Sequence, residues 1–281
     1  MKVSQPNAPC AGPPGLLDRR KTGDRMDLVM GGLPAWGFVL ACAITLGAGF
    51  VKGAVGFAMP LIMIATFSSF MPPDLALAAL ILSVLSTNLH QTFRDGPRAA
   101  VASARAYWRI IATTMAGIAI SAPFVTVIPE RLMLGLLGVP VMAFALMQLR
   151  GWNPPIPERA RHPAQWGLGL VGGLYGGISG IWGPPVIVYL LAMRTPKAEM
   201  VRVLGVVFLI GAVTLTAAHL TTGVLNARTI PFSLALCVPA AMGMWLGYQM
   251  QDRLDAARFR RWTLVVLILV AANLIRRAVT G

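Results

Sequence analysis

The sequence predicts an all-helical protein that crosses a membrane several times, and composition and hydropathy carry this prediction. Of the 281 residues, 56% are apolar and only 12% are charged, with a mean hydropathy of +0.70. Soluble domains are about 45–50% apolar and about 25% charged. Because so little charge cannot cover a water-facing surface, a soluble enzyme, a nucleic-acid-binding module and a disordered chain are excluded as the main form of this protein.

Long apolar runs define the expected helices. A helix needs about 20 apolar residues to cross the hydrocarbon core, whereas the strands of a membrane barrel have about 10 residues and alternate in polarity. The runs in this chain are long and do not alternate, so each is expected to be helical. They cover residues 28–73, 75–93, 110–129, 132–149, 165–193, 203–227, 229–251 and 262–275.

Two of these runs, 28–73 and 165–193, are too long for one straight span and have Gly and Pro in the middle. Both residue types weaken a helix interior, so each run is expected to be a broken helix. Such an element either crosses the membrane or enters and returns on the same side. The two breaks also share a pattern, GFVKGAVGFAMP at 49–60 and GLYGGISGIWGP at 173–184.

A constant offset of 124 residues relates the two patterns, which predicts an internal repeat. The pairs at this offset are Gly49 and Gly173, Gly53 and Gly177, Gly56 and Gly180, Pro60 and Pro184, and Pro72 and Pro196. We therefore expect two transmembrane repeats, 28–149 and 150–281, each with one broken helix and three spans. Internal repeats of this kind are typical of transporters.

Residues 1–27 form a polar tail ahead of the first repeat. Met26 and Met30 are alternative start sites, so we expect the tail to be a gene-model artefact and assign it no function. The three cysteines, Cys10, Cys42 and Cys237, are too far apart in sequence to indicate a disulfide framework or a metal site.

The formal charge of +14 comes from basic residues at the ends of the apolar runs, where Lys and Arg set membrane topology. If both broken helices enter and return, the loops that share one side gather most of these residues. Those loops are 93–109, 150–164, 194–202 and 251–261. By the positive-inside rule this side is cytoplasmic, which predicts inverted repeats with both termini outside.

The second copy, GGLYGGISGIWGPPVIVYLLAMRTPKAEMVR at 172–202, resembles the TauE/SafE family of membrane permeases. The matching residues are Gly173, Gly176, Gly177 and Gly180, then Gly183-Pro184-Pro185, Tyr189-Leu190-Leu191-Ala192, Pro196-Lys197, Glu199 and Arg202. The resemblance implies a multi-pass transporter of the bacterial inner membrane, and not an enzyme. It also implies a small anionic substrate such as sulfite, a sulfonate or another organic anion.

The helix breaks are the first candidate binding site. New half-helices are expected to begin near Phe57–Leu61 and near Gly183–Val186, and helix N-termini attract anions through their partial positive charge and free N–H groups. The alternative use of small residues is close helix packing. The candidate substrate-binding residues at the breaks are Gly53, Gly56, Pro60, Gly177, Ser179, Gly180, Trp182 and Gly183.

Three polar residues inside apolar runs are further candidates. A charged side chain such as that of Lys52 costs on the order of 3 kcal/mol or more at the membrane centre, so we expect it to neutralise a bound anion. The alternative is that Lys52 snorkels to the membrane interface. Asn88 offers donors and acceptors to an oxyanion, or to a neighbouring helix. His219 is a candidate for proton coupling, or else an interfacial histidine.

The sequence thus predicts a secondary transporter that works by alternating access, with a small anion, membrane lipid and a coupling proton as partners. No cofactor, metal or nucleic acid is expected, and the oligomeric state stays open. A passive anion channel is one alternative. Another is a rhomboid-like intramembrane serine protease, since Gly177-Ile178-Ser179-Gly180 forms a GxSG motif and His219 follows on another run.

Overall fold

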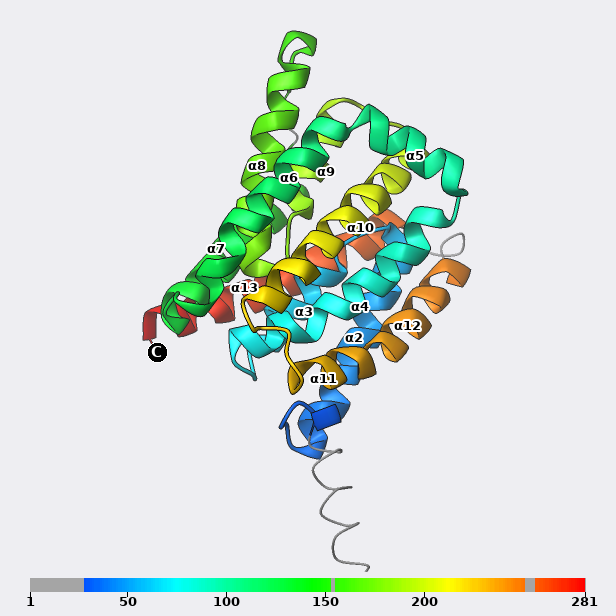
Figure 1. Cartoon of the computed structure of the whole chain (residues 1–281). Helices are drawn as coiled ribbons and strands as arrows, with labels where there is room; N and C mark the ends of the chain where they lie inside the picture. Colours follow the sequence, from blue (N-terminus) through cyan, green and yellow to red (C-terminus); the bar gives the residue numbers. More distant parts are fainter. Residues whose placement is uncertain (1–27, 153–154, 251–255, 281) are drawn as a thin grey trace, which may run out of the picture.

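The computed structural model describes residues 28–152, 155–250 and 256–280, so the predicted tail 1–27 lies outside the described residues. The described residues form helices, turns and loops without any strand (Figure 1), which confirms the all-helical prediction. Among the described residues, seven helical segments are long and apolar enough to cross a membrane. Large apolar side chains such as Trp36, Leu132 and Leu269 are exposed around the bundle, as expected for a surface that faces lipid.

The helices follow the predicted apolar runs, and each long run is divided at its Gly-rich segment. The first half contains α2 (Ala35–Val55), α3 (Met59–Phe67), α4 (Pro73–Phe93), α5 (Pro97–Ala106), α6 (Trp108–Ser121), η1 (Ala122–Thr126) and α7 (Glu130–Leu149). The second half contains η2 (Glu158–Ala160), α8 (Arg161–Ser179), α9 (Gly183–Ala192), α10 (Lys197–Thr221), α11 (Thr229–Ala235), α12 (Cys237–Met250) and α13 (Ala256–Thr280). The first residues of α3 and α9, and those of α4 and α10, are separated by the 124-residue offset of the sequence pattern.

Helix contacts between the halves are reciprocal. The helix before the break in each half packs against a helix of the other half. The helix α2 packs against α12, and α8 packs against α6. The helices that follow the broken elements, α4 and α10, pack against each other. The last helices of the two halves, α7 and α13, also pack against each other. Each contact therefore has a counterpart in which the halves are exchanged.

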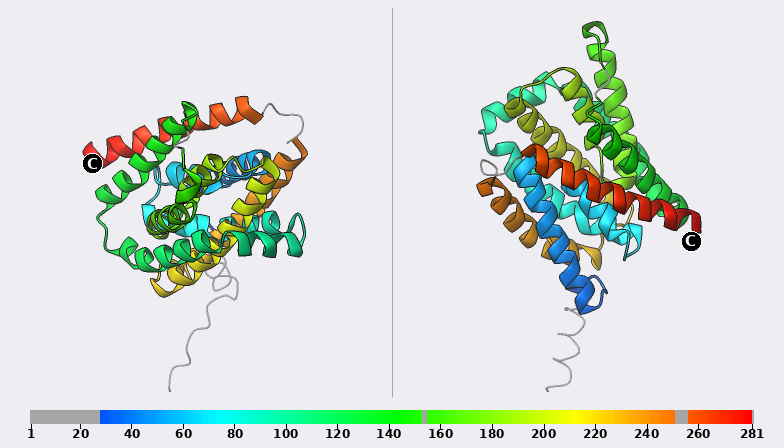
Figure 2. Two further views of the ribbon diagram at one scale, coloured as in Figure 1. Left: turned by 90° about the horizontal axis from the view of Figure 1, so that it is seen from above. Right: turned by 180° about the vertical axis from the view of Figure 1, so that it is seen from behind.

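The second broken element folds back on itself. A methyl group at Gly176 would lie 2.9 Å from Cβ of Trp182, and Gln165 near the start of α8 donates to the Tyr189 hydroxyl of α9 at 2.8 Å. These contacts require α9 to run back along α8. In the first half α3 likewise packs against α2. Figures 1 and 2 show α2 beginning at the lower end of the molecule and α8 at the upper end.

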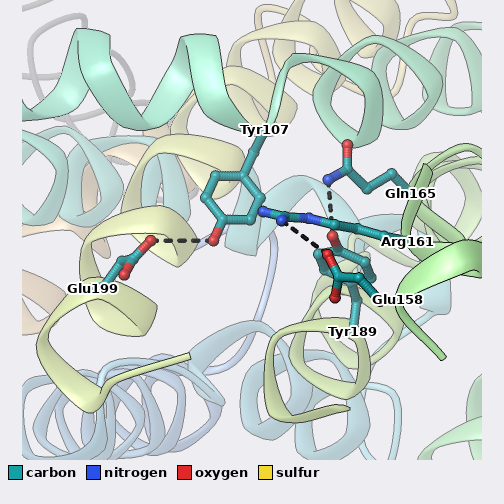
Figure 3. A network of polar contacts seen from close by, with 6 residues as sticks. All are labelled: Tyr107, Glu158, Arg161, Gln165, Tyr189 and Glu199. Atoms are coloured by element: carbon teal, nitrogen blue, oxygen red, sulfur yellow. Dashed lines mark hydrogen bonds and ion pairs between the residues drawn. The ribbon is translucent and has the colours of Figure 1, made fainter. Parts of the chain in front are cut away.

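Three of the four loops expected on one side meet at the upper end. Tyr107 donates to Glu199 at 3.2 Å, Arg202 donates to Ser103 at 3.1 Å, and the rings of Tyr107 and Tyr189 meet edge-on. Figure 3 shows the bond from Tyr107 to Glu199, with Glu158 and Arg161 of the third loop beside Tyr189. The fourth loop, 251–261, lies partly outside the described residues.

Candidate functional site

Two glycines end the broken helices in the same way. Gly56 after α2 and Gly180 after α8 adopt left-handed backbone angles, with φ of 88° and 72°, which glycine reaches without a steric cost. Their N–H groups donate to the carbonyl oxygens of Lys52 at 2.7 Å and Gly176 at 2.8 Å. Because any other residue would be strained there, the two glycines fix the points at which the chain turns.

Each turn leads within a few residues into a new helix. The helix α3 begins at Met59 and α9 begins at Gly183, as predicted. Pro60 and Pro184 occupy the second helical position, where a missing N–H removes no helix bond. The N-termini of both short helices therefore point their partial positive charge into the centre of the protein.

The two breaks meet at one small cavity. Five of the predicted residues line it, namely Pro60, Asn88, Gly180, Trp182 and Gly183. The remaining walls are apolar side chains of Phe57, Ala58, Leu61, Val84, Ile181, Ile187 and Phe208. The space open to the centre of a water molecule is about 20 Å³, which is room for roughly one water. The cavity in this structure is therefore too small for a sulfite or sulfonate ion.

Lys52 lies beside the cavity and is only 1% exposed. Its Nζ donates to Thr87 Oγ1 at 2.9 Å and to Asn88 Oδ1. The snorkelling alternative is therefore wrong, because the side chain turns inward. Within the described residues the only ion pairs are Arg161–Glu158 and Arg277–Glu130, so no carboxylate neutralises Lys52 there.

Asn88 connects this cation to the cavity. Its Oδ1 accepts from Lys52, while its Nδ2 donates to the Phe208 carbonyl at 3.0 Å. An amide group carries two N–H donors, and the bond to Phe208 uses one of them. Asn88 thus lies between Lys52 and the cavity and holds α4 to α10.

The number of donors at the breaks is smaller than helix N-termini usually offer. Pro60, Pro184 and Pro185 have no backbone N–H, so they contribute none. The indole Nε1 of Trp182 is buried without a hydrogen-bond partner in the described part of the chain, but it lies against Gly211 of α10. The cavity lining is therefore almost entirely apolar, and Lys52 lies behind Asn88.

Four predicted residues lie outside the cavity wall in helix contacts or caps. A methyl group at Gly53 would lie 2.2 Å from the Met244 carbonyl oxygen, and one at Gly177 would lie 2.2 Å from Ser121 Oγ. Both glycines therefore allow close helix packing, which was the alternative interpretation. Gly56 caps α2, and Ser179 caps the end of α8 by accepting from the Ile181 N–H at 3.1 Å.

His219 also serves a helix contact. Its Nε2 lies 2.9 Å from the Gly177 carbonyl oxygen and its Nδ1 lies 3.1 Å from Thr222 Oγ1. Since a carbonyl only accepts, Nε2 carries the proton in this contact. Ser179 donates to the Tyr175 carbonyl at 2.7 Å, so serine and histidine each have other partners. This geometry does not support the protease alternative.

Two contributors were not among the residues predicted to bind substrate. Phe208 supplies a wall and a backbone carbonyl, and nothing distinguishes it from other apolar residues of its run. Gln91 donates from Nε2 to the Gly56 carbonyl at 2.9 Å and thereby ties the first break to α4. The signal for Gln91 was its position one helical turn after Asn88.

A multi-pass helical protein with an internal repeat and two helix breaks that meet at a small central cavity has the architecture of a membrane transporter. The chain belongs to the sulfite exporter TauE/SafE family, whose model matches residues 41–274. The members of this family are membrane transporters for sulfite or related anions, and not enzymes. No curated protein and no solved structure matches the chain.

Proposed function

We propose that this protein is a secondary transporter that moves sulfite, a sulfonate or another small organic anion across the bacterial inner membrane. The anion binds in the cavity between the α2–α3 and α8–α9 breaks. The observation that carries this proposal is Lys52, a buried lysine without a carboxylate partner in the described structure that hydrogen-bonds to the cavity residue Asn88.

Charge balance favours an anionic ligand. A cation at membrane depth is costly, and known examples face a cavity or pair with an opposite charge. Lys52 has only the neutral partners Thr87 and Asn88. A bound anion supplies the missing negative charge, while Asn88 and the N-termini of α3 and α9 supply donors and partial positive charge.

The small volume of the cavity favours alternating access over a passive pore. With room for about one water, the cavity cannot pass an anion larger than water unless its walls move. The reciprocal packing of the two halves offers a way to move them, with one half rocking against the other. A channel, in contrast, needs a continuous path.

A flux assay with purified protein in liposomes tests the proposal. Uptake of sulfite, sulfoacetate, taurine-type sulfonates and chloride is measured with and without a pH gradient. We expect saturable sulfite flux that is accelerated by sulfite on the opposite side, and dependence on the pH gradient if a proton is coupled. Linear flux without this acceleration would indicate a channel, and absence of flux for every anion would contradict the proposal.

A further inference from the structure

The contact between α4 and α10 contains a row of buried polar groups that begins at the cavity. Asn88, Gln91 and Thr92 of α4 donate to backbone carbonyls of α10, namely Phe208 at 3.0 Å, Val201 at 3.2 Å and Gly205 at 2.8 Å. We call these three side chains and three carbonyls the polar seam. It follows α4 from the cavity toward the upper end of the molecule, where α4 ends and α10 begins (Figure 1).

The corresponding half of the same contact has fewer polar groups. At the 124-residue offset, Asn88 is replaced by Ala212 and Gln91 by Leu215, and both of these residues are buried. Thr92 corresponds to Thr216, whose hydroxyl donates to the Ala212 carbonyl of its own helix at 2.7 Å. Because buried polar groups are costly in a membrane, helix packing alone does not explain why the other half uses them.

Gln91 has one unpaired atom, the acceptor Oε1, so the group missing at this point is a hydrogen-bond donor such as water. The side chain is 4% exposed, its Nε2 donates to the Gly56 and Val201 carbonyls, and its Oε1 is buried without a partner in the described structure. Gly205 lies beneath it, so that a methyl group there would approach Gln91 Cγ to 3.2 Å. If α4 and α10 separate, the Gln91 amide and the Thr92 hydroxyl become free to donate to an oxyanion.

The helix α5 closes the upper end of the seam, where it packs against both α4 and α10. Arg202 donates to Ser103 of α5, and Tyr107 directly after α5 donates to Glu199. Burial, together with the negative charge of Glu199, raises the pKa of Tyr107, which keeps the phenol a donor in this bond. Figure 3 shows Tyr107 between Glu199 and the Tyr189 ring.

We propose that the polar seam is the path by which the anion moves between the central cavity and the upper end, and that α5 closes this path. The inference rests on the proposed transport function. In the open form Gln91 and Thr92 replace part of the hydration shell of the anion, and Arg202 attracts it at the mouth. The half of the α4–α10 contact that contains Ala212 and Leu215 takes no part in this path.

Cysteine labelling tests the path. In a variant with Cys10, Cys42 and Cys237 replaced by alanine, we add either Gln91→Cys or the matched control Leu215→Cys, which lies 124 residues away. Thr92→Cys is the second seam variant, in case Gln91→Cys does not fold. Membrane vesicles of both orientations receive the anionic thiol reagent methanethiosulfonate ethylsulfonate, with Arg98→Cys as the exposed reference.

We expect both seam cysteines to react from the upper-end side at about 0.1–10% of the rate of the exposed reference, which is the usual population of a minor open state. Leu215→Cys should react at least about tenfold more slowly from that side. Tyr107→Phe removes one hydrogen bond of α5 and should raise the seam rate about fivefold, since such a bond contributes about 1 kcal/mol. Seam cysteines that react no faster than Leu215→Cys would overturn the proposal.

The labelling readout requires no transported substrate, so the two proposals fail separately. Sulfite flux without seam labelling overturns the path and leaves the transport function intact. Seam labelling without flux of any tested anion overturns the transport function. The labelling then shows only that the polar seam opens to water, so the proposal of an anion path also fails. Labelling that is slowed by excess sulfite supports both.

Discussion

The two helix breaks share a left-handed glycine but differ in the residue before the second helix, where φ is 79° at Ala58 and −113° at Trp182, and in their side chains. In the first half, Lys52 reaches across to α4 and the small Ala58 follows the break. At the 124-residue offset the second half has Gly176 and Trp182. The Trp182 indole covers Gly176 and extends onto Gly211 of α10, where a methyl group would lie 2.6 Å from its Nε1.

This difference gives one cavity two unlike walls. Asn88 with Lys52 behind it lies on the first side, and the flat aromatic ring of Trp182 lies on the second. An anion between them is expected to turn its oxygens toward Lys52 and its remaining surface toward Trp182. The repeated glycine turns thus produce the two breaks. The residues that differ between the two halves, such as Lys52 and Trp182, make the two sides of the cavity different.

Paired glycine substitutions test whether the two backbones are equivalent. Gly53→Ala and Gly177→Ala each place a methyl group 2.2 Å from an atom of a neighbouring helix, and overpacking costs about 1–3 kcal/mol or more. We expect both variants to lose most folded protein, as measured by monodisperse yield and thermal unfolding in detergent. Gly47→Ala and Gly167→Ala have open space and should behave like the unmodified protein. If only one of the Gly53→Ala and Gly177→Ala proteins folds normally, the two breaks are not structurally equivalent.

Enlarging the aromatic wall tests its role in selectivity. Trp182→Ala opens space above Gly176 and Gly211, at a stability cost of about 3–5 kcal/mol. We expect the ratio of sulfoacetate flux to sulfite flux to rise in the variant, because the larger anion gains room. Trp182→Phe keeps an aromatic wall and should change this ratio less. An unchanged ratio in a folded Trp182→Ala protein would show that Trp182 does not shape the site.

The smallest expected effect is at Ser179. Its hydroxyl caps α8 through Ile181, and the first half has Val55 at this position and no such cap. We expect Ser179→Ala to lower stability by about 1 kcal/mol and to retain transport. Complete loss of activity in a well-folded Ser179→Ala protein would instead restore a chemical role for this serine.

The sequence was sufficient for the fold class and for the breaks. Long apolar runs define helices in lipid, and Gly and Pro in one register locate the points where those helices end. Lys52 and Asn88 were predictable because a cation and an amide stand out within apolar runs. The structure then brings these two residues together.

Other features depend on contacts that the sequence does not encode locally. Gly56 and Gly53 look alike in sequence, yet Gly56 turns the chain while Gly53 packs against α12. His219 bonds to a carbonyl of another helix, 42 residues away in sequence. The return of α9 along α8 depends on contacts such as Gln165–Tyr189 at the far end of the hairpin.

The central claim is that Lys52 neutralises the transported anion. Lys52→Met keeps the length of the side chain and removes its charge, whereas Arg98→Met removes the same charge from an exposed position. Leaving a buried charge unpaired costs about 3–5 kcal/mol, so we expect Lys52→Met to lower sulfite flux in liposomes at least about a hundredfold, with normal insertion and normal flux for Arg98→Met. Unchanged sulfite flux in the Lys52→Met protein would contradict the account.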